Sequence, residues 1–494
     1  MTVNQYEQLI NDLTNEAKKS DTYFIARFQY RKDLAIQINN GKTEEINSSV
    51  LNGIGIQVVT KDGFMGFAAA DQVSAEIVID LFKKAQSLAD QSRNFNGESN
   101  QEIFKLKALK KKNIVSEKYP LGSLPLENIE AKLIELNKEL IAIDSSRLSV
   151  RTILRITAEE WRIIRSDGTD VTFNTPRSFI YHSLTAKGEG DTATAYANLP
   201  GTDLSIIIEE SNQDLLKARA EKSAKLALDL LHVPKVKSGS YKLVIDYALA
   251  KGLAHEAFGH AAETDALESS ILGENGKMRI GLKVADERLS IIDGPIEGDY
   301  AYQPISAMGV ERKTVKIVDH GRLTAGLSDV FSADRAGVSL TGAERVENFF
   351  HLPIARMTNI RIEFDNPISV KQNFESITPK TLYQILLDHH LITPEENVLY
   401  LSGFQGGQVN PAFGDFVFHC SGIYSLAEEP VLLKPAIFSG QVLSVLKSVS
   451  AAIGPLQIDA MGTCGKMGQG VPSCGGSHYF LVIEKNPEIM IGGE

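Results

Sequence analysis

The chain has 494 residues, of which 43% are hydrophobic and 23% charged, and its formal net charge is −11. This length exceeds the roughly 250–300 residues at which a single hydrophobic core stops growing, so at least two domains are predicted. The acidic balance offers no electrostatic footprint for nucleic acid or for an anionic membrane, and neither is expected as a partner.

The N-terminus and the cysteine content bear on location. Residues 1–7 have no basic start and no apolar run, unlike a signal peptide, and no stretch approaches the roughly 18 apolar residues of a spanning helix. Three cysteines, Cys420, Cys464 and Cys474, are too few for a disulfide framework in so long a chain. A reducing compartment, and hence a cytoplasmic location, is the expectation.

Residues 1–235 are predicted to form an N-terminal domain of mixed α/β structure. Apolar spacing indicates helices at 5–19, 73–90, 126–143 and 214–231. Strand-like runs lie at 22–30, 33–38, 54–60, 64–69, 147–156, 160–164 and 171–173. Asp62-Gly63 is a hairpin signal. Gly53-Ile54-Gly55 begins like a dinucleotide-binding fingerprint, but it lacks the third glycine and continues as a β-pattern, so that interpretation is rejected.

Residues 236–494 are predicted to form a mostly antiparallel β domain with one embedded helix. A linker is expected at 233–239, where Pro, Gly, Ser and charge replace any core pattern. Strands are expected at 314–318, 397–401, 416–420, 442–445 and 479–482. The fold class expected for the whole chain is therefore α+β.

The embedded helix carries the most distinctive pattern in the chain, the run from His255 through Glu256 to His260. Asp246 suits the N-cap, and the small or apolar residues around the motif indicate a largely buried helix. Imidazole is a common zinc ligand, and a free carboxylate beside zinc can act as a general base. Because buried unpaired polar groups are costly, the pattern favours a metal site over a chance pattern in a core helix.

The two histidines are five positions apart, one more than in the His-Glu-x-x-His motif. An α-helix turns about 100° per residue, so His255 and His260 would point about 140° apart. They could then hardly meet one ion at Zn–N distances of about 2.0–2.1 Å. A π-type turn or sharp irregularity is therefore predicted between Glu256 and Ala262, with Gly259 as the place where the backbone tolerates it.

A third ligand is required, because catalytic zinc normally takes three protein ligands and leaves one position for water. Glu263 is near enough in sequence to be a ligand or the partner of a histidine, and Asp265 is another outer-shell candidate. Cys464 is the remote candidate, since glycines flank its loop and Lys466 could help to keep a thiolate ionised. On spacing alone, however, a single cysteine is more often a small buried hydrophobe.

Two segments together resemble the TldD/TldE (PmbA) family of metalloproteases. They are the run from His255 to Asp265 and, far downstream, Cys464-Gly465-Lys466-Met467-Gly468-Gln469. Further similar stretches follow in the family's order at 63–68, 356–360, 406–411 and 414–416. The family has a TldD-like subunit that bears the metal motif and a TldE-like subunit that lacks it. This chain carries the motif and so resembles the TldD-like kind.

The resemblance implies zinc bound by His255, His260 and Cys464, with Glu256 as general base. It implies an N-terminal α/β domain and a C-terminal β-rich domain, assembled as a homodimer or as a heterodimer with a TldE-like subunit around an enclosed cleft. It also implies short or unfolded peptide substrates, held as an added β-strand by main-chain hydrogen bonds. Residues 297–304, Cys474 and His478 depart from the pattern, which leaves substrate preference and endo- or exopeptidase action open.

Two further functions remain beside the leading hypothesis of a zinc-dependent peptidase. A cysteine hydrolase would use Cys464 as nucleophile and His478 as base, and chelator resistance would favour it. A binding or scaffold subunit of a protease complex would carry an inactive site, and absence of metal from the pure protein would favour it. In the leading hypothesis, zinc lowers the pKa of its water toward about 7 and Glu256 takes the proton.

Overall fold

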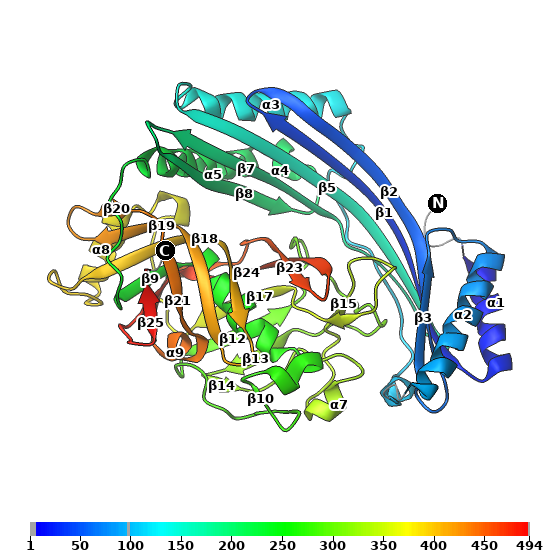
Figure 1. Cartoon of the computed structure of the whole chain (residues 1–494). Helices are drawn as coiled ribbons and strands as arrows, with labels where there is room; N and C mark the ends of the chain where they lie inside the picture. The colour runs from blue at the N-terminus through cyan, green and yellow to red at the C-terminus, as the bar shows by residue number, and fades with distance from the viewer. Residues whose placement is uncertain (1–5, 96–98, 493–494) are drawn as a thin grey trace.

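Two large sheets organise the chain. In this computed structural model, which describes residues 6–95 and 99–492, the described strands form an eight-stranded sheet, a thirteen-stranded sheet and two small hairpins. The first sheet is a long arch that extends over the more compact second half of the chain (Figure 1). Residues 1–5 lie outside the described residues. They include the predicted start of the first helix and most of the N-terminal segment that is unlike a signal peptide.

The arched sheet follows the order β3-β2-β1-β5-β6-β4, and β7 and β8 extend it from β5. Its strands are β1 (Tyr23–Asn39), β2 (Lys42–Val59), β3 (Met65–Ala70), β4 (Lys110–Asn113), β5 (Leu148–Arg165), β6 (Asp170–Asn174), β7 (Arg177–Lys187) and β8 (Thr192–Gly201). The hairpin predicted at Asp62-Gly63 joins β2 to β3 and is confirmed. The strands β7 and β8 fall where the sequence analysis predicted none.

The longest strands of the arch are continuous where the sequence predicted breaks. β1 has 17 residues and pairs with the 18-residue β5 without interruption, although each was expected as two separate strands. Charged residues lie at the predicted break in β1, and their side chains are paired beside the strand. Arg31 donates to Asp33 at 2.8 Å, and Thr157 donates to the same carboxylate at 2.7 Å. The backbone ladder is therefore free to continue past them.

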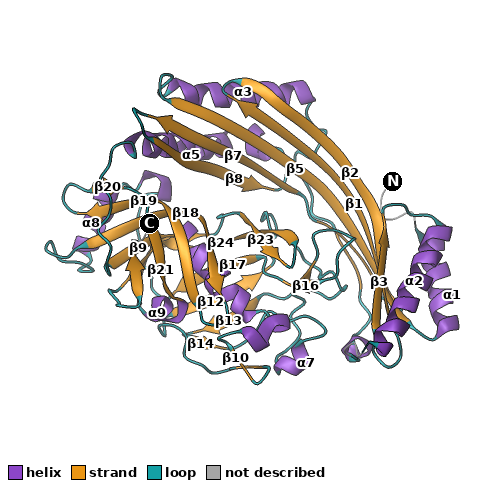
Figure 2. Ribbon diagram, viewed as in Figure 1, coloured by secondary structure: helices purple, strands orange, loops and turns teal. Residues whose placement is uncertain are grey.

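Helices cover the two ends of the arch (Figure 2). They are α1 (Glu7–Ser20), α2 (Ala75–Asn94), the 3₁₀ turn η2 (Glu102–Lys105), α3 (Leu126–Ala142), α4 (Ser205–Ile208) and α5 (Glu210–Asp229). The apolar faces of α1 and α2 bury Leu13, Val78 and Phe82 against β1 and β2. The four predicted helices are confirmed with ends shifted by a few residues, because their 3.6-residue apolar stripes are long and regular.

A buried histidine makes the stability of the arch depend on pH. His182 on β7 is 1% exposed; its Nδ1 lies 2.9 Å from Thr152 Oγ1, which accepts from Asn137 at 2.9 Å. Burial lowers the pKa of His182 from 6.5 to about 4. The unfolded imidazole is then protonated at a higher pH than the folded one, so stability should fall as pH drops from 6.5 to 4, by up to about 3 kcal/mol.

Urea unfolding of the wild type and of His182→Gln between pH 7.5 and pH 4 measures the contribution of His182 to the pH dependence of stability. The variant should be the less stable protein at neutral pH, because Thr152 loses its contact with the buried imidazole and keeps only that with Asn137. Its disadvantage should shrink as pH falls. A constant difference between the two proteins across this range would contradict the prediction.

The second sheet is mixed but mostly antiparallel. Its strands are β9 (Lys242–Asp246), β12 (Leu289–Gly294), β13 (Val315–Asp319), β14 (Arg322–Leu323), β17 (Asn359–Phe364), β18 (Val398–Asn410), β19 (Asp415–Leu426), β20 (Val431–Leu433), β21 (Ile437–Gln441), β22 (Val449–Gln457), β23 (Gly462–Lys466), β24 (Gln469–Ile483) and β25 (Ile489–Ile491). Central β9 is parallel to β18 and antiparallel to β24. The segment 233–239 lies between α5 and β9. The predicted α+β class is confirmed.

The second half contains more helix than the single one predicted. It has α6 (Tyr247–Gly252), η3 (Leu253–Gly259), η4 (His260–Ala262), η5 (Thr264–Ser269), α7 (Ala333–Ala336), η6 (Phe374–Ser376), α8 (Pro379–Asp388) and α9 (Val442–Lys447), besides the hairpins β10 (Gly273–Glu274) with β11 (Lys277–Met278) and β15 (Glu344–Arg345) with β16 (Ile354–Ala355). The strand predicted at 442–445 is wrong. Val442, Val445 and Leu446 are buried at helical spacing in α9, and this tertiary burial outweighs the β-propensity of valine.

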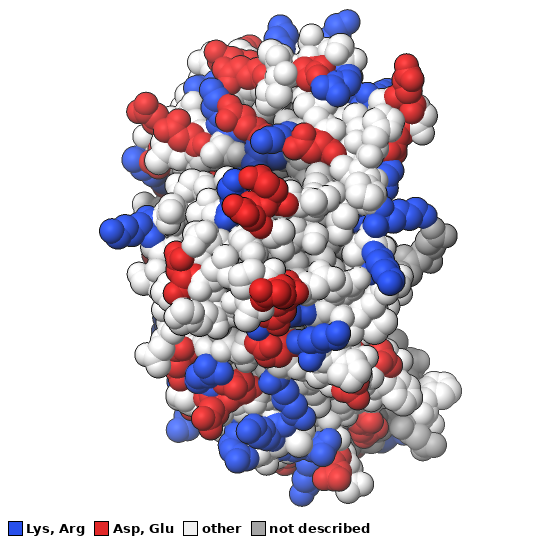
Figure 3. All heavy atoms as spheres, turned by 90° about the vertical axis from the view of Figure 1, so that its left-hand side faces the viewer, with Lys and Arg blue, Asp and Glu red and all other residues white. Residues whose placement is uncertain are grey.

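The surface carries charges of both signs. On the face in Figure 3, acidic and basic side chains are interspersed, without a broad region of one sign. Within residues 6–95 and 99–492, no helix is both long and apolar enough to cross a bilayer.

Candidate metal centre

The helix that carries the two histidines starts at the centre of the second sheet. β9 ends at Asp246, whose Oδ1 accepts the backbone N–H of Leu249 at 2.9 Å and whose Oδ2 accepts that of Gly403 at 2.6 Å. The predicted N-cap is thereby confirmed. One turn of α-helix, α6, follows and leads directly into the motif, so the motif is anchored to a buried strand.

The predicted distortion is present as a π-helix. Residues Leu253–Gly259 form η3, and a 3₁₀ turn over His260–Ala262 ends the element. The backbone N–H of His260 donates to the carbonyl of His255, five residues back. The irregularity starts earlier than the predicted window of Glu256 to Ala262. It absorbs the extra residue, and the two imidazole rings lie edge to face with centroids 5.2 Å apart.

Gly259 is required for space rather than for backbone conformation. Its φ of −60° and ψ of −47° are ordinary helical values, which corrects the expectation that glycine tolerates an unusual geometry here. A Cβ at this position would lie 2.1 Å from Met357 Sδ, 2.9 Å from the Ala254 carbonyl oxygen and 3.0 Å from Ile360 Cδ1. The π-turn is therefore packed directly against β17 and the segment before it.

Cys464 joins the two histidines from β23. His255, His260 and Cys464 each offer one ligand atom, and these three atoms lie within 4.8 Å of one another. Cys464 Sγ is 3.6 Å from His260 Nε2. The structure thus brings together the three residues that the sequence analysis named as ligands, although 204 positions separate Cys464 from His260.

Glu263 orients His260. Its Oε2 lies 3.0 Å from His260 Nδ1, which leaves Nε2 facing Cys464. Such a carboxylate–histidine contact fixes the ring and its tautomer in metal sites. Burial opposes the charged form of His260, but Glu263 and Cys464 outweigh it and raise the pKa of His260 to about 10. Asp265 lies one step further out, because it contacts Lys466 Nζ at 2.7 Å and neither histidine among the described contacts.

His255 is a buried imidazole without a hydrogen-bond partner among the described residues. The ring is 0% exposed, and neither of its nitrogens has a hydrogen-bond partner among the described residues. Burial, reinforced by the charge of Lys251, lowers its pKa well below 6.5, so the ring is neutral and its lone pair is available. An unsatisfied buried polar group costs about 1–3 kcal/mol. A metal ion at the three converging atoms would engage one of these nitrogens and reduce this cost, so these residues fit a metal, and two imidazoles with one thiolate suit zinc.

The thiol of Cys464 has a cationic neighbour that the sequence analysis missed. Arg356 is fully buried; its Nε lies 3.3 Å from Cys464 Sγ, and its Nη2 donates to the Cys464 carbonyl. Arg356 thus places a cationic N–H donor beside the sulfur that would bind a metal ion. Lys466, which was expected in this role, is instead paired with Glu263 at 2.9 Å and with Asp265. The sequence pattern at 356–360 indicated only a similarity to the family and predicted no chemical role for Arg356.

Glu256 is the accessible acid beside this cluster. Its side chain is 24% exposed, and its Oε2 lies 3.9 Å from His260 Nε2. It stands next to the three donor atoms without being one of them. A carboxylate in that position can accept a proton from a water bound there.

The structure separates His478 from Cys464. His478 Nδ1 lies 2.8 Å from the Gly454 carbonyl, and Nε2 accepts the N–H of Phe364 at 3.2 Å, so both nitrogens are engaged. Cys464 pairs with Val471 across the hairpin, and His478 lies seven residues beyond, about 23 Å along β24. The Cys464–His478 pairing is therefore wrong.

Cys474 is also away from the cluster. It is fully buried, and its Sγ lies 3.5 Å from the carbonyl of Ile458. Burial and the nearby Asp299 raise the pKa of this thiol well above 9. It is therefore a neutral thiol that packs in the core.

Comparison with known proteins identifies the family. The chain matches the PmbA/TldA metallopeptidase domain 1 over residues 26–90, the central domain over 119–231 and the C-terminal domain over 238–474. The chain belongs to the PmbA/TldD metallopeptidase family. The resemblance stated from the motifs is confirmed, and membership makes the chain a metallopeptidase, an enzyme that hydrolyses peptide bonds.

Relatives of this PmbA/TldD chain cover nearly its whole length. A metalloprotease of Methanocaldococcus jannaschii is 28% identical over 91% of this chain and 93% of its own. A metalloprotease TldD homolog of Haemophilus influenzae is 26% identical over 99% and 96%. Among solved structures, TldE from Thermococcus kodakarensis has a TM-score of 0.72 at 16% identity, covering 98% of this chain and 100% of its own. At that identity the likeness shows a shared fold.

Proposed function

We propose that this PmbA/TldD chain is a zinc-dependent peptidase for short or unfolded peptides. In this proposal His255, His260 and Cys464 hold the zinc ion, and Glu256 is the general base. The observation that supports it is the convergence of three donor atoms within 4.8 Å around a buried imidazole that has no partner among the described residues. The name of a Saccharolobus solfataricus relative, zinc metalloprotease TldD homolog, supports the choice of metal.

Each residue of the site has a separate task in this mechanism. When bound, zinc supplies a Lewis acid that activates water and polarises the scissile carbonyl. Glu256 takes a proton from the attacking water and gives it to the leaving amine nitrogen. Glu263 holds the His260 ring with Nε2 directed inward, and Arg356 donates to the Cys464 sulfur and holds it in place.

The substrate would lie along β23. Among the described strands β23, which carries Cys464, pairs with β24 alone, so no described strand pairs with its other edge. A peptide added there would use main-chain hydrogen bonds, which accept many sequences but require an extended, unfolded chain. The same proposal includes a partner subunit, either a second copy or a TldE-like chain, as the fold shared with TldE suggests.

Metal analysis of the purified protein and of two cysteine variants tests the ligand set. The wild type should contain about one zinc ion per chain. Cys464→Ala should lose most of it, because two histidines remain, whereas Cys474→Ala should retain it, because that thiol is neutral and outside the cluster. Peptide cleavage should stop when a chelator is added and return with zinc.

Three outcomes would contradict this proposal. Full zinc content in Cys464→Ala would move the third ligand elsewhere, with Glu263 the first residue to examine. Absence of metal from the wild type would favour a binding or scaffold subunit. Chelator-resistant cleavage that a thiol reagent abolishes would contradict the zinc mechanism and require a cysteine nucleophile with a base other than His478.

A further inference from the structure

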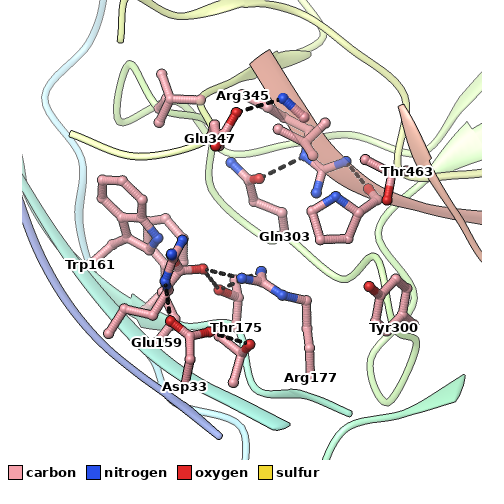
Figure 4. Close-up of a pocket in the computed structure, with 18 of the residues that line it drawn as sticks. Asp33, Glu159, Trp161, Thr175, Arg177, Tyr300, Gln303, Arg345, Glu347 and Thr463 are labelled. Carbon is pink, nitrogen blue, oxygen red and sulfur yellow. Dashed lines mark hydrogen bonds and ion pairs between the residues drawn. The ribbon is translucent and has the colours of Figure 1, made fainter. Parts of the chain in front are cut away.

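A cavity of about 220 Å³ lies between the arched sheet and the second half of the chain (Figure 4). Arg155, Trp161 and Arg177 line it from the arch, while Tyr300, Arg345 and Thr463 line it from the other side. The metal-centre residues do not line it, so it is a separate site.

The cavity is nevertheless close to the candidate metal centre. Thr463 lines its wall and directly precedes Cys464 on β23, and Val471, which also lines it, pairs with Cys464 across the hairpin. Arg345 donates to the carbonyl of Met357 at 2.6 Å, and it is the Met357 side chain that packs against Gly259 in the π-turn. A ligand in the cavity would therefore lie against the same β23–β24 hairpin that carries Cys464.

Two of the four arginines that line this cavity form ion pairs with carboxylates. Arg31 is paired with Asp33 at 2.8 Å, and Arg177 is paired with Glu159 at 2.7 Å. The Arg155 guanidinium has no hydrogen-bond or ion-pair partner among the described residues. The remaining acid, Glu347, accepts the backbone N–H of Gly470 at 2.7 Å. Four arginines thus face three carboxylates, an excess of one positive charge.

Arg345 is the most informative of these residues. It is 2% exposed, and within residues 6–95 and 99–492 no carboxylate forms an ion pair with it. Nε donates to Gln303 at 2.8 Å, and Nη1 donates to the carbonyls of Met357 and Pro472. Nη2 has no partner among the described residues, and Figure 4 shows it directed into the cavity. Removing one partner from a buried charge is costly, so this open donor position points to a ligand that is not part of the chain.

We propose that this cavity binds a carboxylate through Arg345, Arg155 and the Tyr300 hydroxyl. A guanidinium presents a planar fork of donors that matches a carboxylate, and the single excess positive charge suits a monoanion. The Tyr300 hydroxyl also has no partner among the described residues and can donate to the same group. That the carboxylate belongs to a peptide rests on the proposed peptidase function. It is either the peptide's C-terminus or an acidic side chain.

Trp161 provides a direct readout of binding. It is the single tryptophan of the chain, it lines the cavity and it is 6% exposed, so its fluorescence should report on a ligand there. The full-length, zinc-containing Glu256→Gln variant is titrated with a peptide acid and with the same peptide as its C-terminal amide. A second pair, blocked at both ends, carries either Glu or Gln at one internal position.

We expect at least one carboxylate-bearing peptide to bind roughly tenfold more tightly than its neutral partner, as charge-assisted hydrogen bonds would give. A preference for the acid over the amide assigns the cavity to the C-terminus, and a preference for Glu over Gln assigns it to an acidic side chain. Equal binding within both pairs would overturn the proposal.

Variants that remove single donors locate the effect. Arg155→Met and Tyr300→Phe remove side-chain groups without a partner among the described residues, so the fold should be retained. Arg345 is not substituted, because it also donates to two backbone carbonyls. Each variant should reduce the preference several-fold. Arg151→Met on the same strand, outside the cavity, should leave it unchanged. A preference that survives the double variant Arg155→Met/Tyr300→Phe would place the carboxylate elsewhere, for instance on the metal.

The two proposals fail separately. Peptide cleavage that persists in Glu256→Gln would contradict the peptidase mechanism, whereas the fluorescence comparison measures binding alone.

Discussion

Replacing Glu256 with glutamine is expected to abolish peptide cleavage while the protein keeps its zinc. The substitution preserves the shape of the side chain and removes the basic carboxylate. Glu256 lies 3.9 Å from His260 Nε2 and is not one of the three converging atoms, so the ligand set should be unaffected. General-base catalysis contributes about 10²–10⁴-fold, and we expect kcat to fall by at least this factor with a small change in KM.

Glu263→Gln is the matched control, since it makes the same substitution seven residues further on. Glu263 holds His260 in place and should therefore act on metal affinity, with a loss of about 10–100-fold. Zinc content and steady-state cleavage of both variants separate the two roles. Undiminished cleavage by Glu256→Gln would end the proposed mechanism, and loss of zinc from that variant would make Glu256 a ligand.

The second large effect is expected at Gly259, which touches no ligand atom. A valine there would place its Cβ within 3.0 Å of the Ala254 carbonyl and of Met357. The Met357 side chain can move, but the Ala254 carbonyl belongs to the π-helix itself. Gly259→Val should therefore unwind or shift the turn and separate His255 from His260. We expect overpacking to cost about 1–3 kcal/mol of stability and most of the zinc to be lost.

Gly465→Ala provides the control for this prediction. A Cβ at Gly465 meets nothing within 4 Å, although the residue is adjacent to Cys464. It should keep both zinc and stability. Urea unfolding and zinc content of the two variants give the comparison, and a Gly259→Val protein with wild-type values of both would show that the close packing at the π-turn is unimportant.

Residue spacing in the sequence predicted the features that depend on neighbouring residues, namely the π-type turn and the long helices. The spacing of His255 and His260 predicted a π-type turn because helical geometry alone forbids their convergence otherwise. The long helices were predicted because their apolar stripes run for many residues. The continuity of β1 was not predicted, because it depends on Arg31 and Asp33 pairing beside the strand, and that contact does not show in a list of residues.

The same limit applies to the candidate site. Cys464 was named through a family pattern, while Arg356 was not assigned to its thiol, because the two are 108 positions apart and only the fold joins them. The cavity with Arg345 combines strands from both halves of the chain. Arg31 and Arg177 form ion pairs there, whereas Arg155 and Arg345 form none among the described residues. This difference depends on the fold and cannot be predicted from the sequence.

The distance in sequence between the ligands also sets when the site can first exist. His255 and His260 lie near the middle of the chain, but Cys464 lies on a hairpin close to its end, 204 positions after His260. β9, which leads into the motif, itself sits between β18 and β24, both of which follow much later. At about 5–20 residues per second, a ribosome needs roughly 10–40 s to synthesise the intervening chain. A nascent or truncated protein therefore has two histidines without their thiolate. In the proposed mechanism, proteolytic activity would then begin only after β23 and β24 have been synthesised, so a chain that lacks them could not cleave its own exposed segments.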